Sequence, residues 1–391
     1  MANTLGAYNP IFYANQTLLH LRNKLGLAGR IYRGYEQERR SFDRGQTITV
    51  RKPSTFTAQN APSTAQDLNT SSVNILLDTH REVKYILTDK ERAWTDEVIV
   101  TEHIEPAAYA LANDLDQSLA TLFKDVPYTY DYGTAIDHTI LTGALRIPFD
   151  NAVPIDDGNM HFMVNGLLQS YFQNSQVFHS AQITGGVANQ DTLLRGTLGT
   201  RFGVEVFGNQ NTPTHAPGTA VSAGGDTAGA VNNGAGYAVG ITTMAVDGFT
   251  GSETVLIGDT FGIAGQTQKY VLTANSTWTT GAGNITFAPG LVAAVADNAV
   301  VTFTAMVGTE SSATTVSQNL MFHRNFAALA IAPLPDDLPG ADAFTATDPI
   351  SGITVRARRF YVGDTSTLYM ALDILYGKVI LDRNMATRVW T

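Results

Sequence analysis

The sequence of 391 residues has no cysteine, few charged residues and no long apolar run. Without cysteine the chain cannot form a disulfide, a thiolate nucleophile or a sulfur-ligated zinc site. No apolar run reaches the roughly 18 to 20 residues that a membrane helix requires. The segment from Met1 to Arg30 lacks the basic, apolar and small-residue order of a secretory signal. We therefore expect a soluble protein that is made in the cytoplasm.

Charge is scarce and mainly acidic. Asp, Glu, Lys and Arg make up 15% of the residues, whereas a typical soluble domain has about 25%. Either partner subunits cover much of the surface, or the surface is built from Ser, Thr, Asn, Gln and Gly. The net charge of −10 disfavours broad binding to nucleic acid, which needs many Lys and Arg residues. It is compatible with a container, because an acidic or neutral wall repels packed DNA.

Familiar catalytic motifs are also missing. The sequence has no phosphate-binding loop, no Gly-x-Ser-x-Gly elbow and no His-Glu-x-x-His pair. Its histidines are scattered singly, as at His20, His80, His103 and His323, and a lone histidine is more often structural than a ligand. We therefore name no catalytic, cofactor-binding or metal-binding residue and expect no enzyme. An enzyme with an unfamiliar site stays open as an alternative.

Two acidic pairs and one basic cluster are candidate sites. Asp156-Asp157-Gly158 and Asp336-Asp337 could hold a metal ion, but Asp and Gly favour turns and no calcium-loop spacing follows. Arg356, Arg358 and Arg359 place charges on both faces of a predicted strand. They could bind phosphate, but we favour ion pairs, either between subunits or with acidic residues elsewhere in the chain.

The first part of the chain predicts an arm followed by a hairpin. Residues Leu5 to Arg44 read as a helical arm. Thr47 to Lys52 and Val73 to Leu87 alternate as strands, with the polar stretch from Ser54 to Ser72 between them. Such a long tip cannot be buried within its own subunit. We expect an extended hairpin whose tip reaches a neighbour or stays mobile.

Thr101 to Lys124 gives the strongest helix signal. Glu102 and Glu105 favour the N-terminal end of the helix dipole, and Pro106 is tolerated near the start. A stripe faces a core or sheet: Ile104, Ala108, Leu111, Leu115, Leu119 and Leu122. Further predicted elements are a helix from Ala135 to Leu145 ending before Pro148, a strand from His161 to Val164, a helix from Leu167 to Phe178, a helical turn from Asp191 to Leu198 and a strand from Arg201 to Phe207.

Composition changes from Asn211 to Ser317. The span has six acidic residues and one lysine, and Gly218 to Gly236 is of low complexity, which favours a flexible entry segment or a surface loop. Short alternating runs predict a small barrel or sandwich: Ile241–Val246, Glu253–Ile257, Lys269–Thr273, Asn284–Phe287 and Ala299–Thr304. Mixed composition then resumes, with a strand or helix edge at Ala327–Ala332 and strands at Ile353–Val362 and Leu368–Ile380. The insert therefore interrupts one discontinuous domain.

This order of parts resembles the major capsid (coat) proteins of tailed bacteriophages, which have the Hong Kong 97 capsid fold. In more detail it resembles the short-tailed phage type with an inserted β-barrel. Four segments carry the likeness: Leu193–Phe207, Ile257–Gly265, Gly352–Phe360 and Asp373–Leu381. The resemblance implies an α+β fold with an N-terminal arm at 1–45, an extended hairpin loop at 46–90, a peripheral domain with its spine helix at 91–133, an axial domain with returning peripheral strands at 134–210 and 318–391, and the inserted barrel at 211–317.

The resemblance also implies a function. Copies of the chain would self-assemble by non-covalent contacts into hexamers and pentamers of an icosahedral shell around double-stranded DNA, without sequence-specific DNA binding and without a membrane. A scaffolding protein and a portal would be partners, and the virion would be assembled in the host cytoplasm. Some relatives crosslink Lys to Asn, but we assign no such role to Lys52, Lys84 or Lys90. The rival is a secreted or surface β-rich glycan-binding module, which predicts an export signal and a concave aromatic site.

Overall fold

The computed structural model describes residues 14–18, 26–34, 47–51, 58, 60–61, 65, 72–88, 105–133, 137–180, 196–221, 227–306, 315–347 and 353–390. The chain divides into two compact units. The first comprises Met1–Leu119 and Ala327–Leu381, and the second comprises Ala120–Phe326 and Asp382–Thr391. Each unit combines strands with helices, so the predicted α+β class is confirmed.

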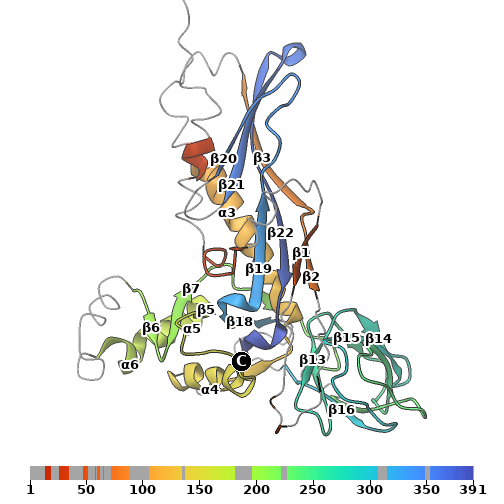
Figure 1. Ribbon diagram of the computed structural model, residues 1–391. Coiled ribbons are helices and arrows are strands. Elements are labelled where there is room, and N and C mark those ends of the chain that lie inside the picture. Colours follow the sequence, from red (N-terminus) through yellow and green to blue (C-terminus); the bar gives the residue numbers. More distant parts are fainter. Residues whose placement is uncertain are drawn as a thin grey trace, which may run out of the picture. The chain divides into compact units, whose positions relative to one another are not determined.

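The first unit is built on β22 (Thr367–Ile380), the longest described strand. One edge of β22 pairs with β3 (Thr79–Thr88), and the other pairs first with β21 (Thr354–Val362) and then with β19 (Ala327–Ala332), always antiparallel. β20 (Asp342–Thr347) extends the sheet beyond β21 (Figure 1). Every residue of β19 is buried, and the segment is a strand, not a helix edge. A run of alanine fits there because small side chains let other backbone pack closely.

The predicted hairpin is present at its base. β1 (Thr47–Arg51) and β2 (Ser72–Leu76) pair antiparallel, from Thr47 opposite Leu76 to Arg51 opposite Ser72. Most of the tip lies outside the described residues, but Ala58, Asn60, Ala61 and Ala65 are described and exposed.

The long helix α3 (Glu105–Ala120) runs alongside the strands of this sheet (Figure 1). It continues as a 3-10 turn, η4 (Thr121–Asp125), while the predicted first turn from Thr101 to Ile104 lies outside the described residues. The predicted stripe is buried at Ala108, Leu111, Leu115, Leu119 and Leu122. In the predicted arm, residues 14–18 are helical, whereas residues 26–34 form bends, a turn and an isolated bridge from Tyr32 to Ala328.

The second unit contains a sheet of mixed direction. Its order is β4 (Thr129–Asp131), β23 (Ala386–Trp390), β18 (Asn319–His323), β5 (Met160–Val164), β7 (Val204–Gly208) and β6 (Gly199–Arg201). Its helices are α4 (Thr139–Asp150), α5 (Gly166–Asn174) and α6 (Gln176–His179). Short 3-10 turns also occur, η5 (Arg324–Phe326) and η7 (Arg383–Met385) in the second unit and η6 (Gly363–Thr365) in the first.

Several predictions for this sheet and its helices were wrong in detail. α4 continues through Pro148 to Asp150: the proline removes one i→i−4 hydrogen bond, to the carbonyl oxygen of Ala144, but the N–H groups of Asn151 and Val153 still bond to the carbonyl oxygens of Ile147 and Pro148. The strand predicted from Arg201 to Phe207 is a hairpin of β6 and β7. Phe202 and Gly203 both have positive φ, 52° and 79°, as a two-residue turn requires. The described part of the helical turn predicted at Asp191–Leu198 has no regular structure.

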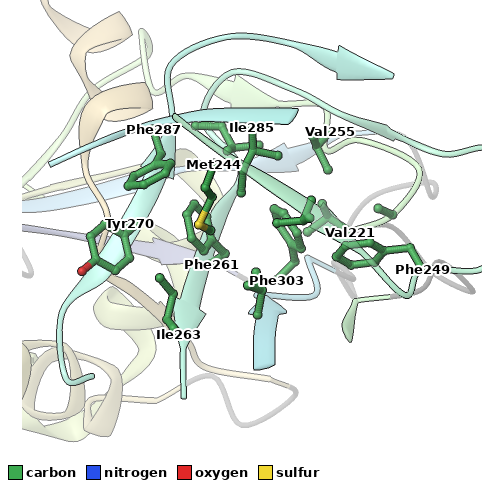
Figure 2. Packing of buried hydrophobic residues seen from close by; sticks show 14 of the residues in the cluster. Val221, Met244, Phe249, Val255, Phe261, Ile263, Tyr270, Ile285, Phe287 and Phe303 are labelled. Atoms are coloured by element: carbon green, nitrogen blue, oxygen red, sulfur yellow. The ribbon is translucent and has the colours of Figure 1, made fainter. Parts of the chain in front are cut away.

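The inserted barrel is closed, as the fold prediction required. Its order is β10 (Thr243–Asp247), β15 (Gly283–Ala288), β13 (Lys269–Leu272), β12 (Thr260–Ile263), β16 (Val300–Phe303) and β9 (Ala228–Val231). Aromatic rings fill its core (Figure 2), with Phe249 stacked on Trp278 at 4.0 Å between centroids and Phe261 stacked on Tyr270 at 5.4 Å. Two small ladders flank it, β8 (Thr214–His215) with β17 (Val316–Ser317) and β11 (Thr254–Val255) with β14 (Ser276–Thr277).

The low-complexity stretch is more than an entry segment or surface loop. β9 closes the barrel from within it, and Ala220 and Val221 are buried in the barrel core. A Cβ at Gly229 would overlap the ring of Phe249. The lack of large side chains therefore serves close packing, which composition alone does not reveal.

Candidate assembly site

The base of the hairpin is held on the first unit by its inward face. Ile48, Val50, Ile75 and Leu77 are buried in one cluster with alternate alanines of β19, Ala328, Ala330 and Ala332. A Cβ at Gly377 of β22 would overlap the carbonyl oxygen of Leu76. The hairpin backbone therefore rests directly on the sheet, and its base has a defined direction.

The outward face of the hairpin has no cover within the described residues. Thr47, Thr49 and Arg51 on β1 and Ser72 and Asn74 on β2 are exposed, and Leu76 is 44% exposed. Small hydroxyl and amide side chains on a firmly held pair of strands can form hydrogen bonds to another chain without desolvating many charges. This face, with the tip beyond it, is the best candidate for contact between copies.

The arginine cluster pairs with acidic residues of its own chain. Arg356 forms a two-pronged ion pair with buried Asp373, with Nε to Oδ1 at 3.0 Å and Nη2 to Oδ2 at 2.6 Å. Arg358 contacts Glu82 at 2.6 Å, and Arg359 contacts Asp342 at 2.7 Å. The ion-pair interpretation is thus the better one, because Arg356 is buried and already engaged.

This network reaches the strand that follows the hairpin. His80 Nε2 lies 3.3 Å from Asp373 Oδ2. Lys84 lies over the stacked rings of Phe360 and Tyr369, at 5.0 and 4.7 Å from their centroids, in a cation–π arrangement. β3, which begins at the foot of the hairpin, is therefore tied to β21 and β22 by charge as well as by its ladder.

No protein-family model and no curated protein matches this sequence. Among solved structures, a chain of Mycobacterium phage Che8 is 13% identical and aligns over 93% of this chain and 90% of its own length, with a TM-score of 0.50. The chain has the tailed-phage major capsid fold. Lower-scoring similarities are to the capsid of cyanophage P-SCSP1u, at 11% identity, 88% and 83% coverage and a TM-score of 0.43, and to the capsid of a native GTA particle, at 7% identity, 96% and 90% coverage and a TM-score of 0.44. The short-tailed type stays a prediction.

In this capsid-fold chain, Asp116 of α3 holds the N-terminal segment, a contact that the sequence analysis missed. Its carboxylate accepts hydrogen bonds from the backbone N–H groups of Gly26, Leu27 and Ala28, at 2.8, 3.1 and 3.1 Å. Burial raises the pKa of Asp116, although these donors and Arg30 act in the opposite direction. The available signal was an acidic residue between Leu115 and Leu119 on the apolar stripe of the helix.

The acidic pairs have structural positions in the capsid fold. Asp157 accepts hydrogen bonds from the Asn159 N–H at 3.0 Å and lies 2.8 Å from Nε2 of buried His323. Burial opposes ionisation, but these contacts outweigh it and lower the pKa of Asp157 to about 2. Asp336 and Asp337 lie in the loop between β19 and β20. Across the described residues, no three His, Asp or Glu side chains are grouped to hold a metal ion, and His20 and His103 lie outside them.

A buried polar group connects the barrel to the rest of the second unit. His215 Nε2 lies 2.7 Å from Asp259 Oδ1, and Asp259 also accepts the N–H groups of Leu256 at 2.7 Å and Gly218 at 3.1 Å. The Arg388 guanidinium is fully buried over the Phe123 ring, and none of its nitrogens has a hydrogen-bond partner in the described structure. Its burial lowers the pKa of Arg388 to about 10. None of the helices in the described ranges has the length and apolar character needed to cross a membrane.

Proposed function

We propose that this chain is the major capsid protein of a tailed phage. Copies assemble by non-covalent contacts into hexamers and pentamers of an icosahedral shell, which encloses double-stranded DNA without reading its sequence. The capsid fold supports this assignment, as do the names of similar structures, the capsids of cyanophage P-SCSP1u and of a GTA particle. The protein then belongs to the virion and is assembled in the host cytoplasm, with a scaffolding protein and a portal as partners.

The observation that carries the proposal is the two-faced hairpin. Its inward face is buried on β19 and β22, whereas its outward face and the described tip residues are exposed. A segment held so firmly at its base, yet uncovered along one face, suits a contact with a sister copy. The exposed face and the N-terminal arm supply the repeated contacts around rings that closed shells need.

Weak contacts are sufficient in such a shell. If each interface contributes about 3 to 4 kcal/mol, a subunit held on several sides rarely leaves, because loss requires all contacts to break together. The low charge content suits extensive surface cover, and the net charge of −10 suits a wall that does not hold the DNA tightly. No catalytic step is assigned.

Domain roles follow from the same proposal. The arm at 1–45 and the hairpin at 46–90 contact neighbours, and the spine-helix region at 91–133 is the peripheral domain. Residues 134–210 and 318–391 form the axial domain with returning strands, and 211–317 form the insertion domain.

The glycan-binding alternative is not favoured. Phe261, Tyr270 and Trp278 of the insert, the part of the chain that suggested this alternative, are buried in the barrel core. A sugar site needs such rings on a concave surface.

Removing the hairpin tip tests the function. Replacing residues 52–71 by a two-residue Asn-Gly turn joins Arg51 to its ladder partner Ser72, and we expect a folded subunit that no longer forms megadalton particles, by sedimentation and negative-stain microscopy. An unchanged unfolding midpoint controls for folding. Undiminished particle formation would contradict the proposal.

A matched pair of threonines tests the outward face. Thr49→Glu places a charge on the exposed face of β1, and Thr243→Glu places one on an exposed position of barrel strand β10. Only Thr49→Glu should reduce particle yield. Equal yields from both variants would show that the hairpin face makes no contact between copies.

A further inference from the structure

A pocket of about 390 Å³ opens in the second unit where the chain enters and leaves the barrel. Three separate parts line it. Lys124 comes from η4, Thr214, His215 and Thr315 from the ladder of β8 and β17 or its edge, and Ile257 and Asn275 from barrel loops. A ligand in this pocket would therefore touch the barrel, its connection and the 3-10 turn that follows α3.

Asp259 fixes the position of the His215 ring. Its side chain is 3% exposed, and Asp259 holds its Nε2 at 2.7 Å. Asp259 is fully buried and also accepts the N–H groups of Leu256 and Gly218. The negative charge of Asp259 is thus compensated by donors and kept away from solvent.

A glycine leaves room between His215 and Lys124. Gly258 has a φ of +100°, and a Cβ there would lie 3.2 Å from His215 Cε1, 3.5 Å from His215 Nδ1 and 3.5 Å from Lys124 Cγ. Any larger residue would fill this gap and also strain the backbone. The absence of a side chain at Gly258 therefore leaves a space beside His215 Nδ1 and the aliphatic part of the Lys124 side chain.

The polar groups around this space are mainly donors. Lys124 is exposed, and its ammonium has no hydrogen bond or ion pair to any residue in the described ranges. Asn275 uses Oδ1 to accept the Ile257 N–H at 2.8 Å, so its Nδ2 remains as a donor. Thr214 and Thr315 add hydroxyl groups. The positive charge thus comes from η4, outside the insert, which itself has six acidic residues and one lysine.

We propose that this pocket binds an oxyanion, a carboxylate or a phosphate group. The Lys124 ammonium supplies the charge, and the Asn275 amide and the threonine hydroxyls orient the oxygens, as in charge-assisted recognition generally. A bound oxyanion links the barrel loops to η4 and stabilises the packing of the barrel against η4. The group comes either from an Asp or Glu side chain of a second copy or from free phosphate.

The free full-length chain tests the site without any assumption about assembly. Sodium phosphate and sodium acetate are titrated by calorimetry and in thermal unfolding, against sodium chloride at equal ionic strength. We expect saturable binding of at least one oxyanion and about tenfold weaker binding by Lys124→Gln, which removes one charge-assisted contact. Lys269→Gln, a change at the other lysine near the barrel, should bind like the wild type. Equal response to chloride, or equal binding by Lys124→Gln, would overturn the proposal.

Amine acylation followed by mass spectrometry distinguishes the two sources, and this arm rests on the proposed shell. Protection of Lys124 in particles washed free of phosphate, but not in free subunits, assigns the group to a neighbouring carboxylate. Protection by added phosphate alone, in both states, assigns it to a free ion. Full reactivity of Lys124 under every condition would refute the site while leaving the capsid function intact.

Discussion

Gly377 of β22 lies directly under the carbonyl oxygen of Leu76, at the end of the hairpin strand β2. A Cβ at this position would overlap that oxygen. The missing side chain thus lets the backbone of β2 rest on the sheet, and the direction in which the hairpin leaves its unit depends on it.

Gly377→Ala is expected to lift the hairpin base. Overpacking of this kind costs about 1–3 kcal/mol. Amide exchange in β1 and β2 should become faster, and particle yield should fall. Gly363→Ala is the control, because a Cβ at Gly363 meets nothing within 4 Å. If the amide exchange rates of β1 and β2 are unchanged in Gly377→Ala, the hairpin does not pack against β22.

The Arg356–Asp373 pair should be costly to break from one side. Asp373 is fully buried, so Arg356→Met leaves its charge with Arg358 at 3.4 Å and His80 at 3.3 Å as the remaining partners among the described residues. We expect a loss of about 3–5 kcal/mol in the free energy of unfolding, measured in urea. The double variant Arg356→Met/Asp373→Met should recover most of this loss.

Removal of an exposed ion pair provides the comparison. Arg146 and Asp150 are 81% and 59% exposed, and Arg146→Ala should change the free energy of unfolding by less than about 1 kcal/mol. A loss in Arg356→Met no larger than this would mean that the buried pair does not form.

Phe249 should be a main support of the barrel. Its ring stacks on Trp278 and covers Gly229, so Phe249→Ala leaves a cavity at both contacts. The expected loss is about 3–5 kcal/mol, seen as a lower unfolding midpoint with altered tryptophan fluorescence. Val239→Ala, at a barrel residue that is 62% exposed, should leave both signals near wild type. A Phe249→Ala variant as stable as Val239→Ala would contradict the packing.

Acid should weaken the second unit through Asp157. The pKa of Asp157 is lowered to about 2 in the folded chain, below its ordinary value near 4. The stability from its ionised contacts with Asn159 and His323 is therefore present above about pH 4 and is lost as the pH falls towards 2. Unfolding between pH 5 and 2 should show a steeper decline for wild type than for Asp157→Asn. Asp156→Asn, at the exposed neighbour, should retain the wild-type slope, and identical slopes for all three would reject this account.

Much of the architecture was readable from local pattern. The period of two at 47–52 and the apolar stripe from Ala108 to Leu119 indicate a strand and a helix, because these spacings decide which side chains share a face. Strand signals at 353–362 and 368–380 likewise indicate β21 and β22. The short runs of the insert likewise indicated a small β domain, whose closure as a barrel needed the pairing of β9 with β10 and β16.

The tertiary structure alone decided the contacts between residues that lie far apart in the sequence. The capture of the Gly26–Ala28 N–H groups by Asp116, the pairing of Arg356 with Asp373, and the approach of Leu76 to Gly377 join segments whose neighbours in sequence carry no sign of the partner. The barrel strand within the low-complexity stretch also depends on a distant contact. Glycine is needed at position 229 because the ring of Phe249, twenty residues further along the chain, packs against it. Periodicity reports the environment of a side chain, but the partner of a buried charge or a glycine depends on how distant segments meet.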